Sequence, residues 1–155
     1  MRSNKTINMN KEYNLEETAW LAFEPRAHYG SDYPLQKETY EILGKCFEVH
    51  KILGKGFLEV IYKDALEIEF QAANIPYERE KSFPVLYKDI LLKRKFNADF
   101  IVYGSVMLEV KAISGLIDGH TKLVSNYLAV TRCRVGLLVN FGEDSLKFKR
   151  IILTK

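Results

Sequence analysis

The sequence predicts an α/β domain, because the spacing of its apolar residues changes period twice along the chain. From residue 35 to the breakers at 74–76 the apolar residues recur at helical spacing, and beyond them they alternate with a period of two. Helical spacing then returns between two β-rich runs, at 106–112 and 135–141. A helical crossover makes such strands parallel, with a right-handed connection. We therefore expect a central mixed sheet flanked by helices.

The composition is that of one globular domain. The chain has 155 residues, of which 47% are apolar and 28% are charged. It contains no apolar stretch of the ~18 residues that a membrane span requires, and its first residues lack the apolar core of a secretory signal. Cys46 and Cys133 match no metal or redox spacing. We therefore expect a cytoplasmic protein with reduced thiols.

The charge is only mildly basic, with a net charge of +3 and a pI of 8.7. Residues 1–34 hold four basic and five acidic residues, so the rest of the chain carries a net charge of +4. Its basic residues gather in clusters at 93–95, 132–134 and 147–150. Such clusters can meet a phosphate backbone, and they are equally ordinary solvated faces.

Residues 1–34 are predicted to be an appendage to the main domain. The segment is polar and rich in asparagine at first, and it then places apolar residues among helix breakers: Trp20, Leu21, Phe23, Pro25, Gly30 and Pro34. This composition fits a segment that is partly disordered, or packed on the domain through the region of Trp20. The domain itself is then residues 35–155.

Two helices are expected at the start of the domain. The first, residues 35–53, ends at Gly54-Lys55-Gly56 and carries an apolar set at helical spacing: Ile42, Leu43, Cys46, Phe47 and Val49. The second, residues 57–73, places one apolar stripe on its surface: Phe57, Leu58, Ile61, Ala65 and Ile68. Asn74-Ile75-Pro76 ends the second helix.

Strands follow the helices. Two hairpins, turning at Lys88-Asp89 and Gly104-Ser105, are predicted to contain four strands: residues 82–87, 90–96, 98–103 and 106–112. Helical spacing resumes over residues 116–131. The chain then ends in two further strands: residues 135–141, which form a continuous apolar run as in a strand covered on both faces, and residues 145–153.

Three charged residues lie inside two strongly apolar strands: Asp99, Glu109 and Lys111. Buried charges are costly unless they are paired or bind an ion. Strand alternation puts Glu109 and Lys111 on the same sheet face. Carboxylate oxygens hold Mg²⁺ or Mn²⁺, and an ammonium beside them can orient a water molecule or offset charge on a phosphate. The pattern therefore predicts a divalent-metal site that acts on a phosphodiester.

This site requires a particular register between the two strands. In a two-residue hairpin on Gly104-Ser105, Asp99 would lie on the opposite sheet face from Glu109 and Lys111. A three-residue loop or a β-bulge near Gly104 shifts the register by one residue and brings the charged residues to one face. The same shift gathers the apolar residues on the core face: Phe100, Val102, Leu108 and Val110. We therefore predict the shifted register.

Glu59 is a candidate third carboxylate. On a helical wheel it lies at the edge of the apolar stripe, beside Tyr62, Leu66 and Phe70. On spacing alone, a solvated glutamate is the commoner outcome. For Tyr62 we favour a structural role, packed beside Glu59 or hydrogen-bonded to it.

Five separated motifs, in the same order, resemble those of the GxxExxY protein family. They are Gly56-Phe57-Leu58-Glu59-Val60-Ile61-Tyr62, Asp99, Glu109-Val110-Lys111, Asn126-Tyr127-Leu128 and Leu137-Leu138-Val139-Asn140-Phe141-Gly142. The resemblance covers residues 36–153. Because this family is grouped with the PD-(D/E)XK nuclease superfamily, the resemblance implies a restriction-endonuclease-like αβββαβ core.

The resemblance also implies a function and a role for each site residue. The protein would be a metal-dependent nuclease that hydrolyses phosphodiester bonds, with DNA favoured over RNA and with Mg²⁺ or Mn²⁺ as the cofactor. Asp99 would be the principal metal ligand, Glu109 the second ligand, and Glu59 the helix carboxylate that closes the site. Lys111 would be the catalytic lysine, and Tyr62 would support the site. We expect nucleic-acid contacts from four further residues: Arg94, Lys95, Lys122 and Asn126. A homodimer, the commonest assembly, fits this function.

One position departs from the family pattern. Members commonly carry a glutamine three residues before the Asn-Tyr-Leu motif, and here that position is Leu123. A leucine cannot hydrogen-bond a ligand or a phosphate, and the adjacent Lys122 points about 100° around the helix. An alternative function therefore stays open, namely a catalytically impaired module of the same fold that binds nucleic acid or a protein partner.

Overall fold

The computed structural model describes residues 34–153, so nearly all of the predicted appendage lies outside the described residues. Three helices are described: α2 (Gln36–Leu53), α3 (Glu59–Ala72) and α4 (Asp118–Thr131). The main sheet has five strands in the order β1-β4-β5-β6-β7. Their bounds are Tyr77–Phe83 (β1), Phe96–Val102 (β4), Val106–Lys111 (β5), Val135–Asn140 (β6) and Lys147–Ile152 (β7).

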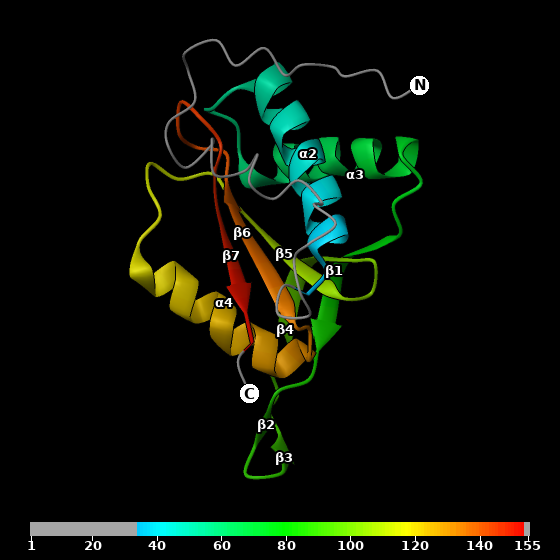
Figure 1. Cartoon of the computed structure of the whole chain (residues 1–155). Helices are drawn as coiled ribbons and strands as arrows, with labels where there is room; N and C mark the ends of the chain where they lie inside the picture. Colours follow the sequence, from blue (N-terminus) through cyan, green and yellow to red (C-terminus); the bar gives the residue numbers. More distant parts are fainter. Residues whose placement is uncertain (1–33, 154–155) are drawn as a thin grey trace.

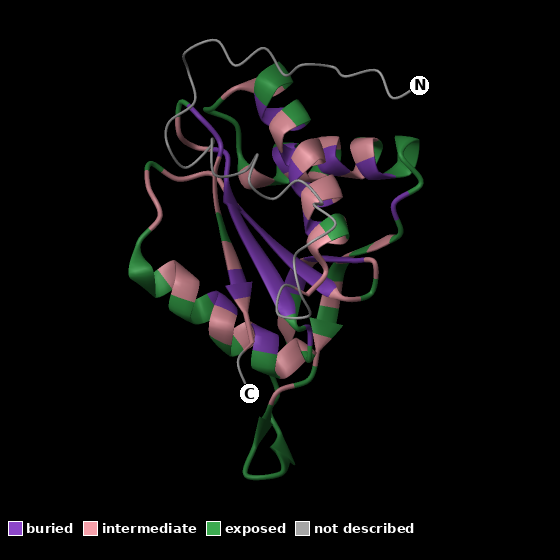
Figure 2. Cartoon of the chain, viewed as in Figure 1, coloured by how far each residue is buried: buried purple, intermediate pink, exposed green. Residues whose placement is uncertain are grey.

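The predicted parallel pair is confirmed. β5 and β6 run parallel with Glu109 opposite Leu138, and α4 is the crossover between them. The other neighbouring strands of the main sheet are antiparallel. The sheet is therefore mixed, and its neighbouring strands β5 and β6 are buried on both faces, as Figure 2 shows.

Helices cover both faces of the sheet (Figure 1). α2 and α3 pack on the face that carries Phe100, Leu108 and Leu137, whereas α4 packs through Val124 and Leu128 on the opposite face. This arrangement is the restriction-endonuclease-like α/β fold that the sequence predicts. No helix within residues 34–153 combines the length and the hydropathy needed to cross a lipid bilayer.

The strands of the first predicted hairpin are wrong in their bounds and do not belong to the main sheet. The sequence predicts strands at 82–87 and 90–96, whereas the edge strand of the main sheet is β1, which pairs antiparallel with β4. The side chains of β1 alternate between exposed and half-buried, because a charged edge strand buries only one modest face and leaves little apolar periodicity. Pro84 follows β1 and lacks the N–H needed to continue the ladder.

A short hairpin lies beyond Pro84 and projects from the body of the protein (Figure 1). It consists of β2 (Leu86–Tyr87) and β3 (Ile90–Leu91), which pair with each other and form a separate two-stranded sheet. The predicted turn at Lys88-Asp89 is confirmed, with φ values of 47° and 63°. Positive φ at both central residues is the signature of a type I′ turn.

The buried stripe of α3 also differs from the predicted one. α3 begins at Glu59, so Phe57 and Leu58 precede the helix, and Ile68 is 67% exposed. The buried side consists of residues spaced by four: Tyr62, Leu66 and Phe70. Two of these three are aromatic and bury more area than the aliphatic residues of the predicted stripe.

Tyr62 fixes the start of α3 against the sheet. Its hydroxyl donates a hydrogen bond to the Gly54 carbonyl (2.6 Å) and accepts one from the Phe57 N–H (3.3 Å). Its ring stacks on Phe141, with 4.6 Å between the ring centroids. The structural role favoured for Tyr62 is confirmed, but its hydrogen bonds are made to the α2–α3 loop and not to Glu59.

Replacing Tyr62 by phenylalanine removes these hydrogen bonds while keeping the stacked ring. The loop carbonyl and N–H lose their partner, so we expect the free energy of unfolding to fall by about 1–2 kcal/mol in urea denaturation. The matched control is Tyr87→Phe on the exposed hairpin, where Tyr87 is 60% exposed and we expect a change below about 0.5 kcal/mol. Equal losses in the two variants would contradict the anchoring role.

Candidate metal centre

The candidate centre lies where β4 and β5 part. The two strands pair regularly around a three-residue loop as far as Phe100 and Leu108, which confirms the predicted register. One residue farther, side chains replace the ladder. The Asp99 carboxylate accepts a hydrogen bond from the Val110 N–H at 2.8 Å, and the Glu109 carboxylate accepts a long one from the Asp99 N–H at 3.4 Å. The two acids therefore lie beside each other between the strands.

The edge strand is irregular at the same level. The pairing of β1 with β4 omits Glu80 and Asp99, and Glu80 has a left-handed φ of 52°. The alternation of β4 also breaks at Asp99, since Ala98 and Ile101 both pack on the α4 side of the sheet. This irregularity, which the sequence did not reveal, frees the Asp99 side chain from the regular pattern of either face.

Lys63 of α3 reaches Asp99 from the helix side. Its ammonium lies 3.1 Å from an Asp99 carboxylate oxygen, and it also pairs with Glu80. Burial acts to lower the pKa of Lys63, but hydrogen bonds to Glu80 and Asp99 outweigh burial and raise it. Lys63 therefore stays charged and pairs with the Asp99 side chain. Sequence reasoning missed Lys63, although it stands four residues after Glu59 and so on the same side of the helix.

A hollow of about 450 Å³ opens beside Glu109 and Lys111. Arg94 and Lys95, which precede β4, also line it. The structure thus brings two of the four predicted nucleic-acid contacts to the acids. The other two are exposed on α4 and do not line the hollow: Lys122 and Asn126.

Glu59 is half-buried at the first position of α3. Within residues 34–153, no three acidic, histidine or cysteine side chains lie close enough together to hold a metal ion. The structure therefore brings together Asp99 and Glu109, but it does not join Glu59 to them in one cluster. A metal role for Glu59 remains a prediction.

The fold agrees with a comparison against protein families. Residues 36–151 match the model of the PD-(D/E)XK nuclease superfamily. The chain belongs to this superfamily. Nucleases of this superfamily act on nucleic acid and generally use divalent metal ions.

Comparisons with curated proteins and with solved structures give little further information on this PD-(D/E)XK domain. No curated protein matches the chain. One similar solved structure is described as the crystal structure of SSO0001, with 24% sequence identity and a TM-score of 0.48. The alignment covers 59% of this chain and 48% of the other, so the chain spans about half the length of that structure.

Burial and like charge set the ionisation of Glu109. Glu109 is only 7% exposed. Burial and then the negative charge of Asp99 raise the pKa of Glu109 to about 8, whereas the Asp99 N–H and the charge of Lys111 act to lower it. Below this pH the carboxyl group is largely protonated, and a bound cation would favour its ionised form.

The donor set fits a hard divalent cation. Mg²⁺ is commonly held by one or two protein carboxylates, with waters and substrate phosphates completing its coordination. Asp99 and Glu109 supply two adjacent carboxylates, and the hollow beside Glu109 leaves room for further oxygen ligands. The centre of this PD-(D/E)XK domain can therefore bind a cation without a third acid in the same cluster.

Asn140 fixes the chain that follows Lys111. Its side-chain oxygen accepts hydrogen bonds from the N–H groups of Ile113 (3.0 Å) and Gly142 (3.1 Å), and its amide donates to the Ile113 carbonyl (2.9 Å). A Cβ on Gly142 would lie 2.3 Å from that carbonyl, so only glycine fits. The Asn-Phe-Gly motif is thus a structural clamp for the end of β5, a role that sequence reasoning did not assign.

The raised pKa of Glu109 predicts how stability depends on pH. The unfolded chain releases this proton near its ordinary pKa of 4.5, whereas the folded chain keeps it up to about pH 8. The folded state therefore binds more protons across this window, and the metal-free protein loses stability as pH rises from about 4.5 to 8.

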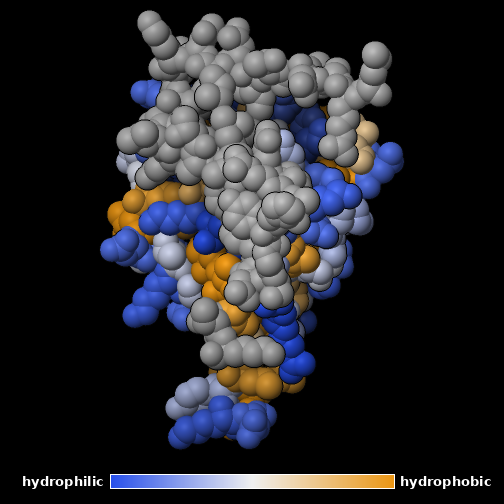
Figure 3. Space-filling model, viewed as in Figure 1, coloured by the Kyte–Doolittle hydropathy of each residue, from blue (hydrophilic) through white to orange (hydrophobic). Residues whose placement is uncertain are grey.

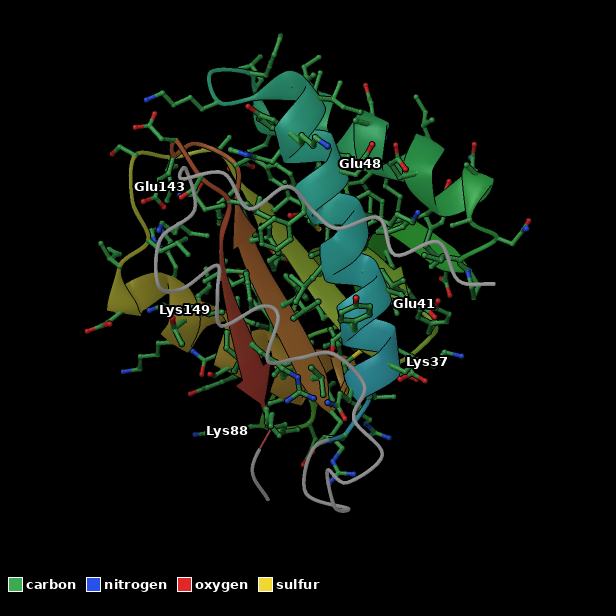
Figure 4. All side chains as sticks on the ribbon, turned by 45° about the horizontal axis from the view of Figure 1, so that its top comes forward. Lys37, Glu41, Glu48, Lys88, Glu143 and Lys149 are labelled. Carbon is green, nitrogen blue, oxygen red and sulfur yellow. The ribbon has the colours of Figure 1, made fainter. Side chains whose placement is uncertain are left out.

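Glu109→Gln removes this loss. In urea denaturation with chelator, we expect the variant to exceed the wild type at pH 8 by on the order of 2 kcal/mol, and to be close to it at pH 5. The control is Glu48→Gln on the exposed side of α2 (Figure 4), which keeps the wild-type pH profile. Parallel pH profiles for the wild type and Glu109→Gln would show that Glu109 is not perturbed.

Proposed function

We propose that this protein is a metal-dependent nuclease of the GxxExxY type that hydrolyses phosphodiester bonds in DNA, or in RNA. One observation carries the proposal: Glu109, which lies beside a second acid, Asp99, borders a hollow that Lys111, Arg94 and Lys95 make basic. A cation bound between the acids would offset their negative charge. The basic side of the hollow would in turn offset the negative charge of a phosphate. DNA is placed before RNA on the resemblance to the family alone.

Each residue has a role in this proposal. Asp99 and Glu109 would hold Mg²⁺ or Mn²⁺, and Glu59 would close the site from the start of α3. The bound cation would supply positive charge to the phosphate and acidify a water molecule. Lys111, two residues after Glu109 on the same face, would orient that water or offset charge on the phosphate. Other phosphates of the nucleic acid would contact basic and amide side chains: Arg94, Lys95, Lys122 and Asn126.

Lys63 acts as a positioning residue for the metal ligand. Its ammonium pairs with the Asp99 carboxylate, and Glu80 offers it a second carboxylate. When a cation takes up the charge of Asp99, Lys63 can therefore remain paired with Glu80. The ion pair in the metal-free protein is thus compatible with metal binding.

The alternative function is a non-catalytic module that binds nucleic acid or a protein partner. Two observations favour it: Leu123 stands at the hollow where the family commonly has glutamine, and Asp99 already has a lysine partner. A homodimer, which would present two such sites, fits either function. Metal binding and cleavage separate the two functions.

Metal binding is tested by thermal melting with increasing Mg²⁺ or Mn²⁺. Ligand that binds only the folded state stabilises it, and at a concentration 100-fold above the Kd the gain is about 2.7 kcal/mol, a rise of several degrees in Tm. We expect the rise to grow from pH 6 to pH 8, because the cation displaces the Glu109 proton. Asp99→Asn and Glu109→Gln should abolish the rise, and Glu48→Gln should keep it. A wild-type Tm that ignores both metals would reject the metal site.

Catalysis is tested by cleavage of labelled single-stranded and double-stranded DNA and RNA with Mn²⁺. Lys111→Ala should retain the metal-induced rise in Tm and lose cleavage by about 100-fold or more, because its ammonium acts on the reacting groups. The control is Lys51→Ala, an exposed lysine of α2, which should cleave as the wild type does. Nucleic acid bound without any metal-dependent cleavage would favour the binding module.

A further inference from the structure

The hollow beside the acids has an apolar half that the proposed chemistry does not use. Leu92 and Leu123 line it and are 46% and 40% exposed, and Val85, Phe96 and Tyr127 line it as well. Exposed leucines at the entrance of a site whose substrate is a polyanion call for a physical explanation. Neither a metal ion nor a phosphate makes a favourable contact with an exposed leucine side chain.

Two residues that line this apolar half, Phe96 and Tyr127, belong to a row of aromatic rings. Phe96 and Tyr127 stack with 3.7 Å between their centroids and 20° between their planes, and Phe83 continues the row at 6.3 Å from Phe96. The negative charge of Glu109 is among the causes that raise the pKa of Tyr127, so this ring lies near the acids. The row joins β1, β4 and α4 into a rigid apolar surface beside the candidate centre.

The projecting hairpin extends the same surface. The Leu92 N–H donates to the Val85 carbonyl at 2.9 Å, which closes the base of the hairpin at the rim of the hollow. Beyond the base, both strands expose large side chains, each at least 60% exposed: Leu86, Tyr87, Ile90 and Leu91. Figure 3 shows apolar residues just above the hydrophilic tip of the hairpin. Two strands of two residues cannot bury these side chains by themselves.

The charge around this surface indicates what covers it. Residues 86–95 hold four basic residues and one acidic residue, and Lys111 adds a further positive charge within the hollow. A surface that is both basic and apolar, with a tyrosine at its edge, matches a strand whose phosphates and base faces are exposed together. A duplex offers phosphates but keeps its base faces stacked inside, so it would leave the leucines without contacts.

We propose that the hollow and the β2–β3 hairpin bind an unpaired nucleic-acid strand. Unpaired bases pack on the apolar side formed by Leu92, Leu123 and Tyr127, while Arg94 and Lys95 hold the phosphates. Binding in this way places a phosphodiester bond of a single strand, or of an unpaired region in a longer duplex, beside the acids. The inference rests on the proposed function and specifies its substrate class.

The test is a binding experiment in chelator, so that no cleavage occurs. Fluorescence anisotropy compares a labelled DNA strand of about 20 nucleotides, the same sequence as RNA, and the DNA duplex. We expect an unpaired strand to bind about tenfold or more tightly than the duplex. The double variant Leu92→Ser/Leu123→Ser should lose about tenfold in affinity for the strand and little for the duplex, since one base stacked on an apolar platform contributes roughly 1–3 kcal/mol.

Two further variants separate apolar contact from charge. Arg94→Ala/Lys95→Ala should weaken binding of both substrates and reduce the salt slope of single-strand binding by about 1.4, the value for two phosphate contacts. Ile52→Ser/Ile68→Ser is the matched control, because both isoleucines are 67% exposed, on α2 and α3. It should bind as the wild type does. Thermal melting of every variant checks that these exposed substitutions leave the fold intact.

The outcomes distinguish this inference from the proposed function. Duplex binding that equals or exceeds strand binding overturns the inference, and metal-dependent cleavage of the duplex would then leave the nuclease standing. A Leu92→Ser/Leu123→Ser variant that loses self-association, but not affinity for the strand, also overturns it, since the surface would then bind protein. If neither strand nor duplex binds and no metal raises the Tm, the proposed function fails together with the inference.

Discussion

Asp99 and Glu109 share one gap between β4 and β5, and the rest of the structure keeps these two acids together. Each carboxylate accepts a backbone hydrogen bond at the point where the ladder stops, so the acids are part of the sheet and not attachments to it. Two like charges in an apolar setting repel each other and lose hydration. Lys63 compensates Asp99, and Glu109 is left with a pKa of about 8. A divalent cation is the simplest further compensation.

The scaffold fixes this gap from both sides. Tyr62 fastens the start of α3 to the loop before it and stacks on Phe141, so the helix that presents Lys63 has a defined position. Asn140 clamps the residues after Lys111. Tyr62 and Asn140 therefore have structural roles, in packing and hydrogen bonding, whereas Asp99 and Glu109 form the acid pair of the candidate centre and Lys111 lines the hollow beside it.

The sequence predicts the features that apolar patterning controls. The register of β4 and β5 follows because only one register buries Phe100 and Leu108 on the same face, and that register also joins the acids. The edge strand β1 is not predicted because its residues are mostly charged. The apolar residues of the exposed hairpin instead favour longer strands than the structure has there. Lys63 could not be predicted, since a helical wheel gives a side chain's direction but not its partner on another element. The left-handed backbone conformation of Glu80, beside Asp99, cannot be predicted from the composition of the segment.

The central proposal is that Asp99 and Glu109 together bind a divalent cation. It is tested most directly by following the Glu109 carboxyl carbon by NMR through a pH titration, with and without saturating Mg²⁺. Without metal the group should titrate near pH 8, and with metal its pKa should fall below its ordinary value, because the cation replaces the proton. An ordinary pKa without metal, or a pKa near 8 that Mg²⁺ leaves unchanged, would contradict the claim.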